Sequence, residues 1–439
     1  MNADKARADQ NPCADQNPYA DQNPYADQNP NTGAEHPAVF EFVHTLWIKA
    51  QLEAPPSVQR GVIPRLHGAK EIARLLLNPF LPVYEMQGQG QGSPLTVIYI
   101  GLEFTKPFMK KLLFVEEPVE RQVGRVPFWR CQELADSASS DIVIVESTRH
   151  LVQRLPSRNG FAFPELIEHL VDVRGDWEDV RSRFRRSVRR QDLRVIRKYG
   201  YEYEVSHDRQ DFEHFYHHMY VPTMDGRHGE MSVPTLYSEA CQHFEHGLLF
   251  RVKRDGDWAA GAVCYPKQDV LMASLAGIRD GDEELLREGA VSALYHVAIL
   301  WANQNGFAAV NFMGSAARLK SGGFQHKRKW GTAVRVSPNL HRQIWVRVRR
   351  ITPAVSQFLQ ENPFAVVDKD GKLYGLVVVD DVRNVSAETR QQLEKLYVTP
   401  GLDRLVVRSV DSLVDQAVAV DAPTLVIPIP PSSIVGNGR

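Results

Sequence analysis

The region between residues 247 and 313 constrains the fold most, because the order of its strands and helix can be predicted directly. Its first two apolar runs are separated by an Asp-Gly pair within residues 254–257, and this arrangement strongly indicates a β-hairpin. A third strand, a helix that stops at Gly306 and a fourth strand follow. The predicted elements are strands over 247–253, 258–265 and 270–277, a helix over 289–305 and a strand over 309–313.

The rest of the chain predicts further domains, since 439 residues exceed one ordinary hydrophobic core. At the N-terminus the unit Ala-Asp-Gln-Asn-Pro recurs every six residues from Ala8, which is typical of a disordered tail. Apolar residues at three- and four-residue steps predict an amphipathic helix over 177–198. The predicted division is a repeat tail over 1–36, a first domain over 37–200, a second over 201–345 and a C-terminal α/β extension over 346–439, with a hairpin about 369–372 and first-domain strands over 95–100 and 141–146.

The overall composition does not indicate that the whole molecule binds a charged partner. The 52 Lys and Arg residues nearly balance the 53 Asp and Glu residues, so any attraction to nucleic acid or membrane must be local. No apolar run approaches the roughly 18 residues that a membrane-spanning helix needs. The four cysteines lack the spacing of a zinc site. We therefore expect a cytoplasmic protein with no membrane span and no metal.

Cations crowd the segment 181–198, and few acidic residues stand four positions away to pair with them. A solvated charged face is one interpretation. The other is a surface for an anionic group such as a phosphate or RNA, and it makes Arg186, Arg189 and Arg190 candidate substrate-binding residues.

The segment 220–229 joins an aromatic helix to a turn. We expect the helix to stop at Pro222 and the turn to present Arg227 and His228. Arginine suits contact with phosphate or carboxylate, and histidine can take a proton near neutral pH. His228 is thus a candidate base, and Arg227 and Tyr220 are candidate substrate contacts.

Before the 289–305 helix, a strand is followed by a loop with glycines and then by the start of the helix. Free backbone N–H groups at such a junction can bind an anion. Arg287, Gly289 and Ala290 are the candidate cofactor contacts, although a plain connection fits as well and nearby acidic residues would repel a pyrophosphate.

The most informative stretch is 311–331, which closes with Trp-Gly. Within it the glycines at 314, 322 and 323 lie around the cations at 327, 328 and 329. Such a loop suits a place where backbone amides approach a ligand and a cation offsets developing negative charge. Lys327 is the candidate catalytic residue, and Asn311 a candidate substrate contact.

Three segments together resemble one family. They are the arginine-rich segment from Phe184, the aromatic segment through Tyr216 to His228, and the sequence Gly-Phe-x-x-Lys-x-x-Trp-Gly over 323–331. Over residues 95–335 the chain resembles the Fem-ligase-like branch of the GNAT acyltransferases, which includes an acetyltransferase domain found in cellulose-biosynthesis-associated proteins. The pyrophosphate loop of GNAT proteins has only a degenerate counterpart, Arg287-Glu-Gly-Ala290.

The resemblance implies an α/β fold with two GNAT-like domains, each with a mixed sheet, and direct attack of an amine on a thioester or aminoacyl ester. It implies that Lys327 stabilises the oxyanion or the donor phosphate. The co-substrate is then acyl-CoA or aminoacyl-tRNA, and the acceptor a small molecule or cell-envelope precursor, with tRNA as a further partner. The alternative is a non-catalytic GNAT-fold protein that binds RNA or a phosphorylated sugar.

Overall fold

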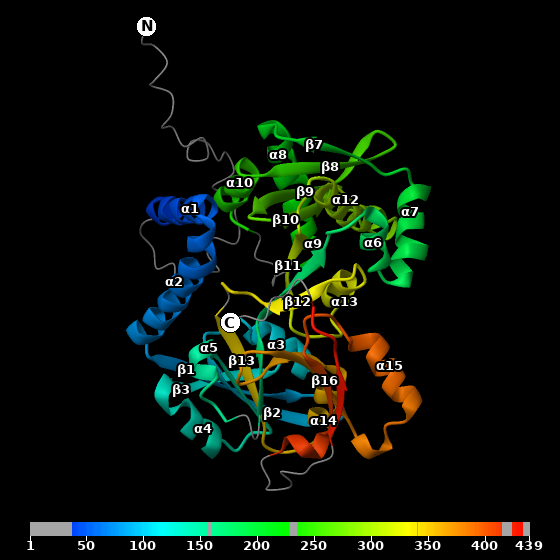
Figure 1. Cartoon of the computed structure of the whole chain (residues 1–439). Helices are drawn as coiled ribbons and strands as arrows, with labels where there is room; N and C mark the ends of the chain where they lie inside the picture. Colours follow the sequence, from blue (N-terminus) through cyan, green and yellow to red (C-terminus); the bar gives the residue numbers. More distant parts are fainter. Residues whose placement is uncertain (1–36, 157–159, 229–234, 340, 415–423, 433–439) are drawn as a thin grey trace. The chain divides into compact units, whose positions relative to one another are not determined.

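A computed structural model describes residues 37–156, 160–228, 235–339, 341–414 and 424–432. The repeat tail predicted over 1–36 lies outside these residues. The chain forms two compact units (Figure 1). Of the described residues, unit 1 takes those within 37–59, 173–177 and 186–310, and unit 2 takes those within 60–172, 178–185 and 311–432.

Unit 1 is built on four antiparallel strands in the order β10-β9-β8-β7. The predicted hairpin is confirmed between β8 and β9, because Asp255 and Gly256 both have positive φ, of 52° and 85°, as a tight hairpin turn requires. The strands are β7 Glu202–Ser206, β8 Leu248–Arg254, β9 Asp257–Lys267 and β10 Val270–Ile278.

Helices cover both faces of this sheet. Leu249 packs in a core with residues of α8, η5 and α10, whereas the ring of its neighbour Phe250 lies 5.7 Å from that of Trp301 in α12. Successive strand residues point to opposite faces, so α12 lies opposite α8, η5 and α10. The helices of unit 1 are α1 Pro37–Glu53, η4 Val188–Asp192, α7 Leu193–Lys198, α8 Arg209–Phe215, η5 Tyr216–Tyr220, α9 Val221–His228, α10 Tyr237–Glu245, η7 Arg279–Gly281, α11 Glu283–Arg287 and α12 Ala290–Gln304.

Two sequence predictions about helix ends are wrong. Pro222 does not stop the aromatic helix, because α9 runs from Val221 to His228. The preceding π-helical turn η5, where the Val221 N–H donates to the Tyr216 carbonyl, replaces the usual bonding pattern ahead of the proline.

The single helix predicted over 177–198 is instead broken after α6, Trp177–Ser182. The break falls where Phe184 is buried with its ring 5.3 Å from that of Trp330. There the Arg185 N–H also donates to the Lys329 carbonyl. Tertiary packing therefore overrides the helical periodicity.

Unit 2 contains a six-stranded sheet in the order β3-β1-β2-β4-β13-β5, in which β2 and β4 run parallel. Ile144 and Val145 of β4 are both fully buried and belong to separate cores on the two faces. The strands are β1 Phe80–Gln89, β2 Pro94–Gly101, β3 Val119–Pro127, β4 Ile142–Thr148, β5 Gly160–Pro164 and β13 Arg342–Val348. Six helices precede these strands in the chain, connect them or follow them. They are α2 Pro56–Leu77, α3 Lys106–Leu113, η3 Phe128–Arg130, α4 Cys131–Ser137, α5 Arg149–Val152 and α14 Pro353–Glu361.

Two further groups of strands complete unit 2. Strand β12, Ala333–Val336, pairs antiparallel with β6, Leu166–Asp172, and β6 neighbours β11, Ala309–Ala316, which leads to α13, Gly322–Arg328. The C-terminal sheet has the order β14-β15-β16-β17, and its first hairpin confirms the one predicted about 369–372. Its elements are β14 Phe364–Val367, β15 Leu373–Val379, η8 Val382–Asn384, α15 Ala387–Tyr397, β16 Arg404–Ser409, η9 Val410–Leu413 and β17 Thr424–Pro428.

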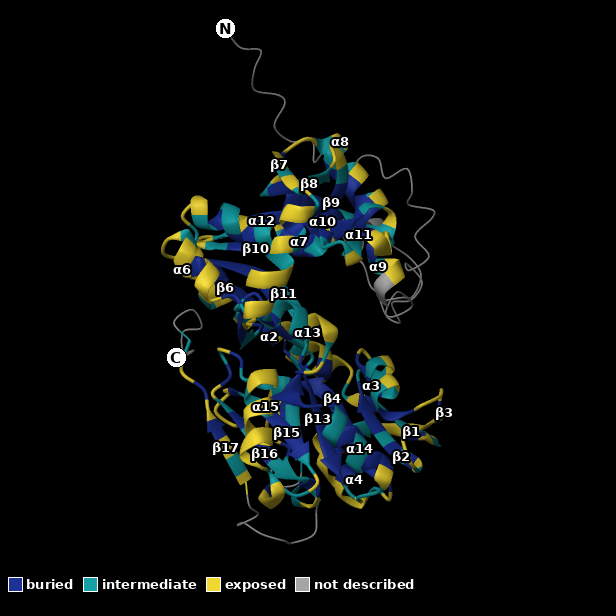
Figure 2. Ribbon diagram, turned by 90° about the vertical axis from the view of Figure 1, so that its right-hand side faces the viewer, coloured by how far each residue is buried: buried dark blue, intermediate teal, exposed yellow. Residues whose placement is uncertain are grey.

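The predicted α/β class with mixed sheets is confirmed, since both β2–β4 and β15–β16 are parallel pairs within sheets that also contain antiparallel pairs. The strands form the buried layers, whereas α15 has no buried residue (Figure 2). Within the described residues, no helix has both the length and the apolar character needed to cross a membrane.

Candidate functional site

Lys327 is positioned by the turn between β11 and α13. The Ser321 hydroxyl caps the helix by accepting from the Phe324 N–H, and the fully buried Phe324 ring anchors its first turn. The Lys327 ammonium donates to the Gly314 carbonyl at 2.5 Å. An ammonium has three N–H donors, and this is the one hydrogen bond it makes among the described residues.

The environment of Lys327 favours loss of its proton. The residue is partly buried, and desolvation lowers the pKa of its ammonium to about 8, because a low dielectric disfavours the charged form. At neutral pH the group remains mainly protonated. It therefore combines a positive charge with N–H donors beyond the one that the Gly314 carbonyl accepts.

A buried histidine that the sequence analysis missed lies near this lysine. His169 of β6 has Nε2 at 2.8 Å from Ser315 Oγ and Nδ1 at 3.2 Å from Thr332 Oγ1. Burial, and secondly the Lys327 charge, hold the pKa of His169 well below its usual range. His169 is thus a neutral imidazole between two hydroxyls. Nothing in its local sequence distinguishes it from a core residue.

Asn311 is used inside the protein. Its side-chain nitrogen donates to Glu168 Oε2 at 3.1 Å, and its oxygen accepts from the Met313 N–H at 2.8 Å. The second bond supports Met313 in a left-handed conformation with φ of 58°, which is unusual for a residue other than glycine. The role of Asn311 in substrate binding stays a prediction.

The candidate arginines of residues 181–198, here called the basic segment, differ in whether they line a surface hollow. Arg186 and Arg190 line a surface hollow of about 320 Å³ together with Ser187 and Gln191, and neither has an acidic partner among the described residues. Arg189 is exposed but does not line the hollow. The hollow therefore presents two guanidinium groups that are available for an anion.

Tyr220 and the segment after it occupy the end of the aromatic helix. The Tyr220 hydroxyl donates to Thr235 Oγ1 at 3.1 Å and accepts from the Thr235 N–H at 2.9 Å. It therefore ties the helix to the chain before α10. Arg227 and His228 lie in the last turn of α9, and their side chains lie outside the described residues.

The junction before α12 has the predicted strand, loop and helix order. Gly289 precedes the helix with φ of 91°, and a Cβ at this position would lie 2.9 Å from Val195 Cγ1. Ala290 is fully buried, while Arg287 is exposed at the end of α11. Glycine is required here by both conformation and space.

Unit 1 contains a second serine–histidine pair. His243 of α10 has Nδ1 at 2.8 Å from Ser274 Oγ, and its Nε2 lies 4.0 Å from a carboxylate oxygen of Glu239. Ser274 falls where the β9–β10 register shifts, and such bulges redirect side chains. Burial lowers the pKa of His243 to about 4.

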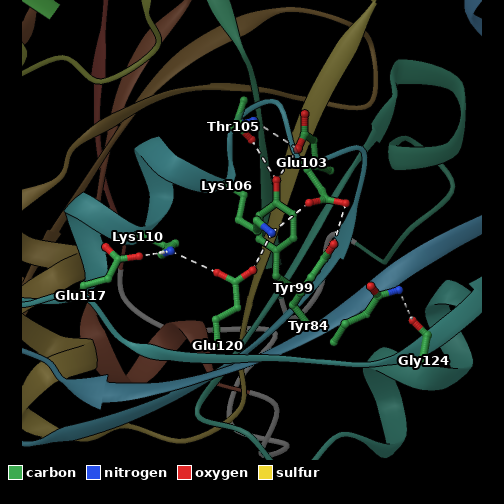
Figure 3. Close-up of polar contacts among 11 residues, drawn as sticks. Tyr84, Tyr99, Glu103, Thr105, Lys106, Lys110, Glu117, Glu120 and Gly124 are labelled. Carbon is green, nitrogen blue, oxygen red and sulfur yellow. Dashed lines mark hydrogen bonds and ion pairs between the residues drawn. The ribbon is translucent and has the colours of Figure 1, made fainter. Parts of the chain in front are cut away.

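A charged network surrounds the start of α3 in unit 2 (Figure 3). The Lys106 ammonium lies 2.9 Å from Glu103 and 2.6 Å from Glu120, and it stands 3.5 Å from the centre of the Tyr84 ring. The Tyr84 hydroxyl donates to Glu103 at 2.7 Å. These charges satisfy one another, so the network holds the loop after β2 in place.

A desolvated carboxyl group is bonded to two residues beside this network. Glu146 is fully buried and accepts from the Tyr99 hydroxyl and, at 3.2 Å, from the Thr105 N–H. Both bonds reach Oε2, while Oε1 has no hydrogen-bond partner among the described residues. Burial raises the pKa of Glu146. None of the residues predicted for the site lies in this network.

Part of the chain matches the model of a known family. Residues 182–328 match the family model of the acetyltransferase (GNAT) domain, a range that begins in the basic segment and ends just after Lys327. This part of the chain is therefore similar to a GNAT acetyltransferase domain. The resemblance drawn from the three sequence segments is confirmed at this level.

Similar solved structures include FemX, with 12% identity over 70% of this chain and 96% of that one and a TM-score of 0.34. L-PGS from Bacillus licheniformis has 12% identity over 62% and 87%, with a TM-score of 0.28. A probable N-acyltransferase from Enterococcus faecalis V583 has 7% identity over 76% and 83%, with a TM-score of 0.24. A search of curated proteins found no match.

Proposed function

We propose that this protein is an N-acyltransferase or aminoacyltransferase that moves an acyl group from a thioester or ester donor to an amine. The observation that carries the proposal is the Lys327 ammonium within the GNAT domain, which has a single hydrogen bond among the described residues and a pKa lowered to about 8 by desolvation. A carbonyl under attack develops negative charge on its oxygen, and a fixed cationic donor stabilises that charge.

In the proposed reaction the neutral acceptor amine attacks the donor carbonyl directly. The new C–N bond forms as the carbonyl electrons move onto oxygen, where Lys327 donates a hydrogen bond. The C–S or C–O bond then breaks, and the thiol or hydroxyl leaves with the proton given up by the amine. We propose His228 as the base that first takes a proton from the ammonium form of the acceptor, because most unperturbed amines are protonated at pH 7 and only the neutral form attacks.

The hollow lined by Arg186 and Arg190 supports a phosphate-bearing donor. Acyl-CoA and aminoacyl-tRNA both carry phosphates, and arginine can bind them in a bidentate manner. Arg189, Arg227, Tyr220 and Asn311 are the proposed contacts for a small-molecule or cell-envelope acceptor. Arg287, Gly289 and Ala290 are the proposed contacts for a donor pyrophosphate.

The test is an acyl-transfer assay with panels of acyl-CoAs and charged tRNAs, chosen by the rise in melting temperature that each donor causes. Replacing Lys327 with Ala should lower turnover about 10²- to 10³-fold and leave donor binding nearly intact. Lys320, which is exposed in the same segment, supplies the matched control, since Lys320→Ala should keep full turnover. Equal loss in both variants would contradict the role of Lys327.

Donor binding is tested separately at the hollow. The double change Arg186→Gln and Arg190→Gln should weaken donor affinity and reduce its dependence on salt. If donors bind through these arginines but the wild-type protein transfers no acyl group, the non-catalytic binding function is correct and the transferase proposal fails.

A further inference from the structure

Helix α2 exposes an apolar face that the described part of the chain does not cover. Leu76 and Leu77 are 62% and 87% exposed, and Val62 and Leu66 are 45% and 47% exposed. The exposed Ala69 lies between them at helical spacing, as does Ala73, so these residues form one stripe along the helix. Ile63 and Leu75 are buried on the other side of α2. The helix is therefore apolar toward the protein and also toward the outside.

The exposed apolar surface continues beyond the end of α2. Phe80 begins β1 with 49% exposure, and Trp129 in η3 is 62% exposed. The two segments lie together, because Phe80 pairs with Pro127 and the Phe128 N–H donates to the Pro79 carbonyl at 2.8 Å. We call the α2 stripe together with Phe80 and Trp129 the apolar edge. Large aromatic and leucine side chains side by side are uncommon on an unoccupied surface.

The charges of α2 complement an anionic surface. From Arg60 to Leu77 the helix carries four Lys or Arg residues and a single acidic one, Glu71, in a chain whose net charge is −1. Arg65 and Lys70 are exposed on the two sides of the stripe, and neither has an acidic partner among the described residues. Apolar side chains flanked by cations are typical of helices that lie in the interface of an anionic lipid layer.

The same charges disfavour a second copy of the chain as the occupant. In a symmetric dimer each surface meets its own copy, so the cations beside the stripe would face the same cations. An anionic lipid surface offers apolar contact and opposite charge together. We propose that the apolar edge docks this protein on the surface of an anionic membrane, with α2 lying in the headgroup region.

The test measures how the full chain partitions onto vesicles of phosphatidylcholine with and without phosphatidylglycerol. We expect binding to the vesicles that contain phosphatidylglycerol and weaker binding as salt is raised. Changing both Leu76 and Leu77 to Ser should lower the partition coefficient at least tenfold. Changing Arg65 and Lys70 to Gln should lower it about fivefold per charge and flatten the salt dependence.

Matched controls separate this surface from general stickiness. Leu396 in α15 is 48% exposed, and Leu396→Ser should leave partitioning unchanged, as should Lys369→Gln at another exposed position. Urea midpoints confirm that each variant is folded. The proposal is overturned if the wild-type chain does not bind anionic vesicles, or if the leucine variant binds as well as the wild type. It is also overturned if size exclusion finds a wild-type dimer that the leucine variant converts to monomer.

Discussion

Each unit holds a histidine that is 2.8 Å from a serine hydroxyl, and the two pairs differ in what the second ring nitrogen meets. In unit 2, His169 bonds Ser315 through one nitrogen and Thr332 through the other. In unit 1, His243 bonds Ser274, and its other nitrogen lies 4.0 Å from the Glu239 carboxylate. The first ring is bonded to two neutral hydroxyls, whereas the second has a hydroxyl at one nitrogen and a carboxylate 4.0 Å from the other. An identical serine contact therefore does not define an identical role.

The largest expected effect is on stability. Replacing His169 with Ala opens a cavity and removes the ring partner of two buried hydroxyls, of which Ser315 keeps its 3.2 Å contact to the Ala316 carbonyl, so we expect a loss of about 3–5 kcal/mol in the free energy of unfolding. Replacing His243 with Ala should cost about 2 kcal/mol, because Ser274 is only partly buried and water can reach it. Urea denaturation of the two variants measures the difference. Equal losses would mean that the enclosure of His169 has no energetic consequence.

The second expectation concerns pH. Burial lowers the pKa of His243 to about 4, below the 6.5 of an unfolded histidine. The unfolded state therefore binds more protons below pH 6.5, and the native state loses about 3 kcal/mol of stability as the pH falls from 6.5 to 4. His243→Gln should remove this slope. The difference in unfolding free energy between variant and wild type across that range is the measurement, and a parallel pair of curves would contradict the lowered pKa.

A smaller effect links Lys327 to one histidine and not the other. The Lys327 charge contributes to the low pKa of His169, so Lys327→Met should raise the pKa of His169 and leave that of His243 unchanged. Titration of the imidazole NMR signals checks both rings at once. If the two pKa values move together, the substitution has altered the fold and not a local charge.

The smallest effect tests the acid beside His243. Glu239→Gln removes a carboxyl group 4.0 Å from Nε2 and should lower the pKa of His243 only slightly, since burial and the charges of His246 and Lys267 dominate that pKa. His169 serves as the internal control for the same NMR titration. An unchanged His243 pKa would remove the distinction drawn between the two pairs.

Local sequence signals predicted the elements whose cause is local. The Asp-Gly turn near Asp255, the helix that ends before Gly306 and the strand of β4 follow from turn chemistry and hydrophobic runs, and the structure contains them all. The break at Phe184 and the continuation of the helix through Pro222 depend on Trp330 and on a π-helical turn. Neither the distant Trp330 nor the π-helical turn can be predicted from the residues next to these positions.

In the candidate site, too, features with a local cause could be predicted and features that depend on distant residues could not. Lys327 stood out because glycines and cations surround it in the sequence. His169 did not, since its partners Ser315 and Thr332 are distant in the chain and meet it only after β6 and β11 become neighbours. Sequence reasoning identified residues in unusual local composition and missed those that become polar partners through folding.

The position of β13 in the six-stranded sheet sets an order for folding during synthesis. Within that sheet β5 neighbours β13 alone, yet β5 ends at Pro164 and β13 begins at Arg342. A nascent chain must therefore carry β5 as an unpaired edge while nearly two hundred residues emerge from the ribosome, whereas the strands of unit 1 are complete by Val310. Unpaired edges invite association with other chains, so unit 2 is where slow translation or a missing chaperone would cause aggregation first.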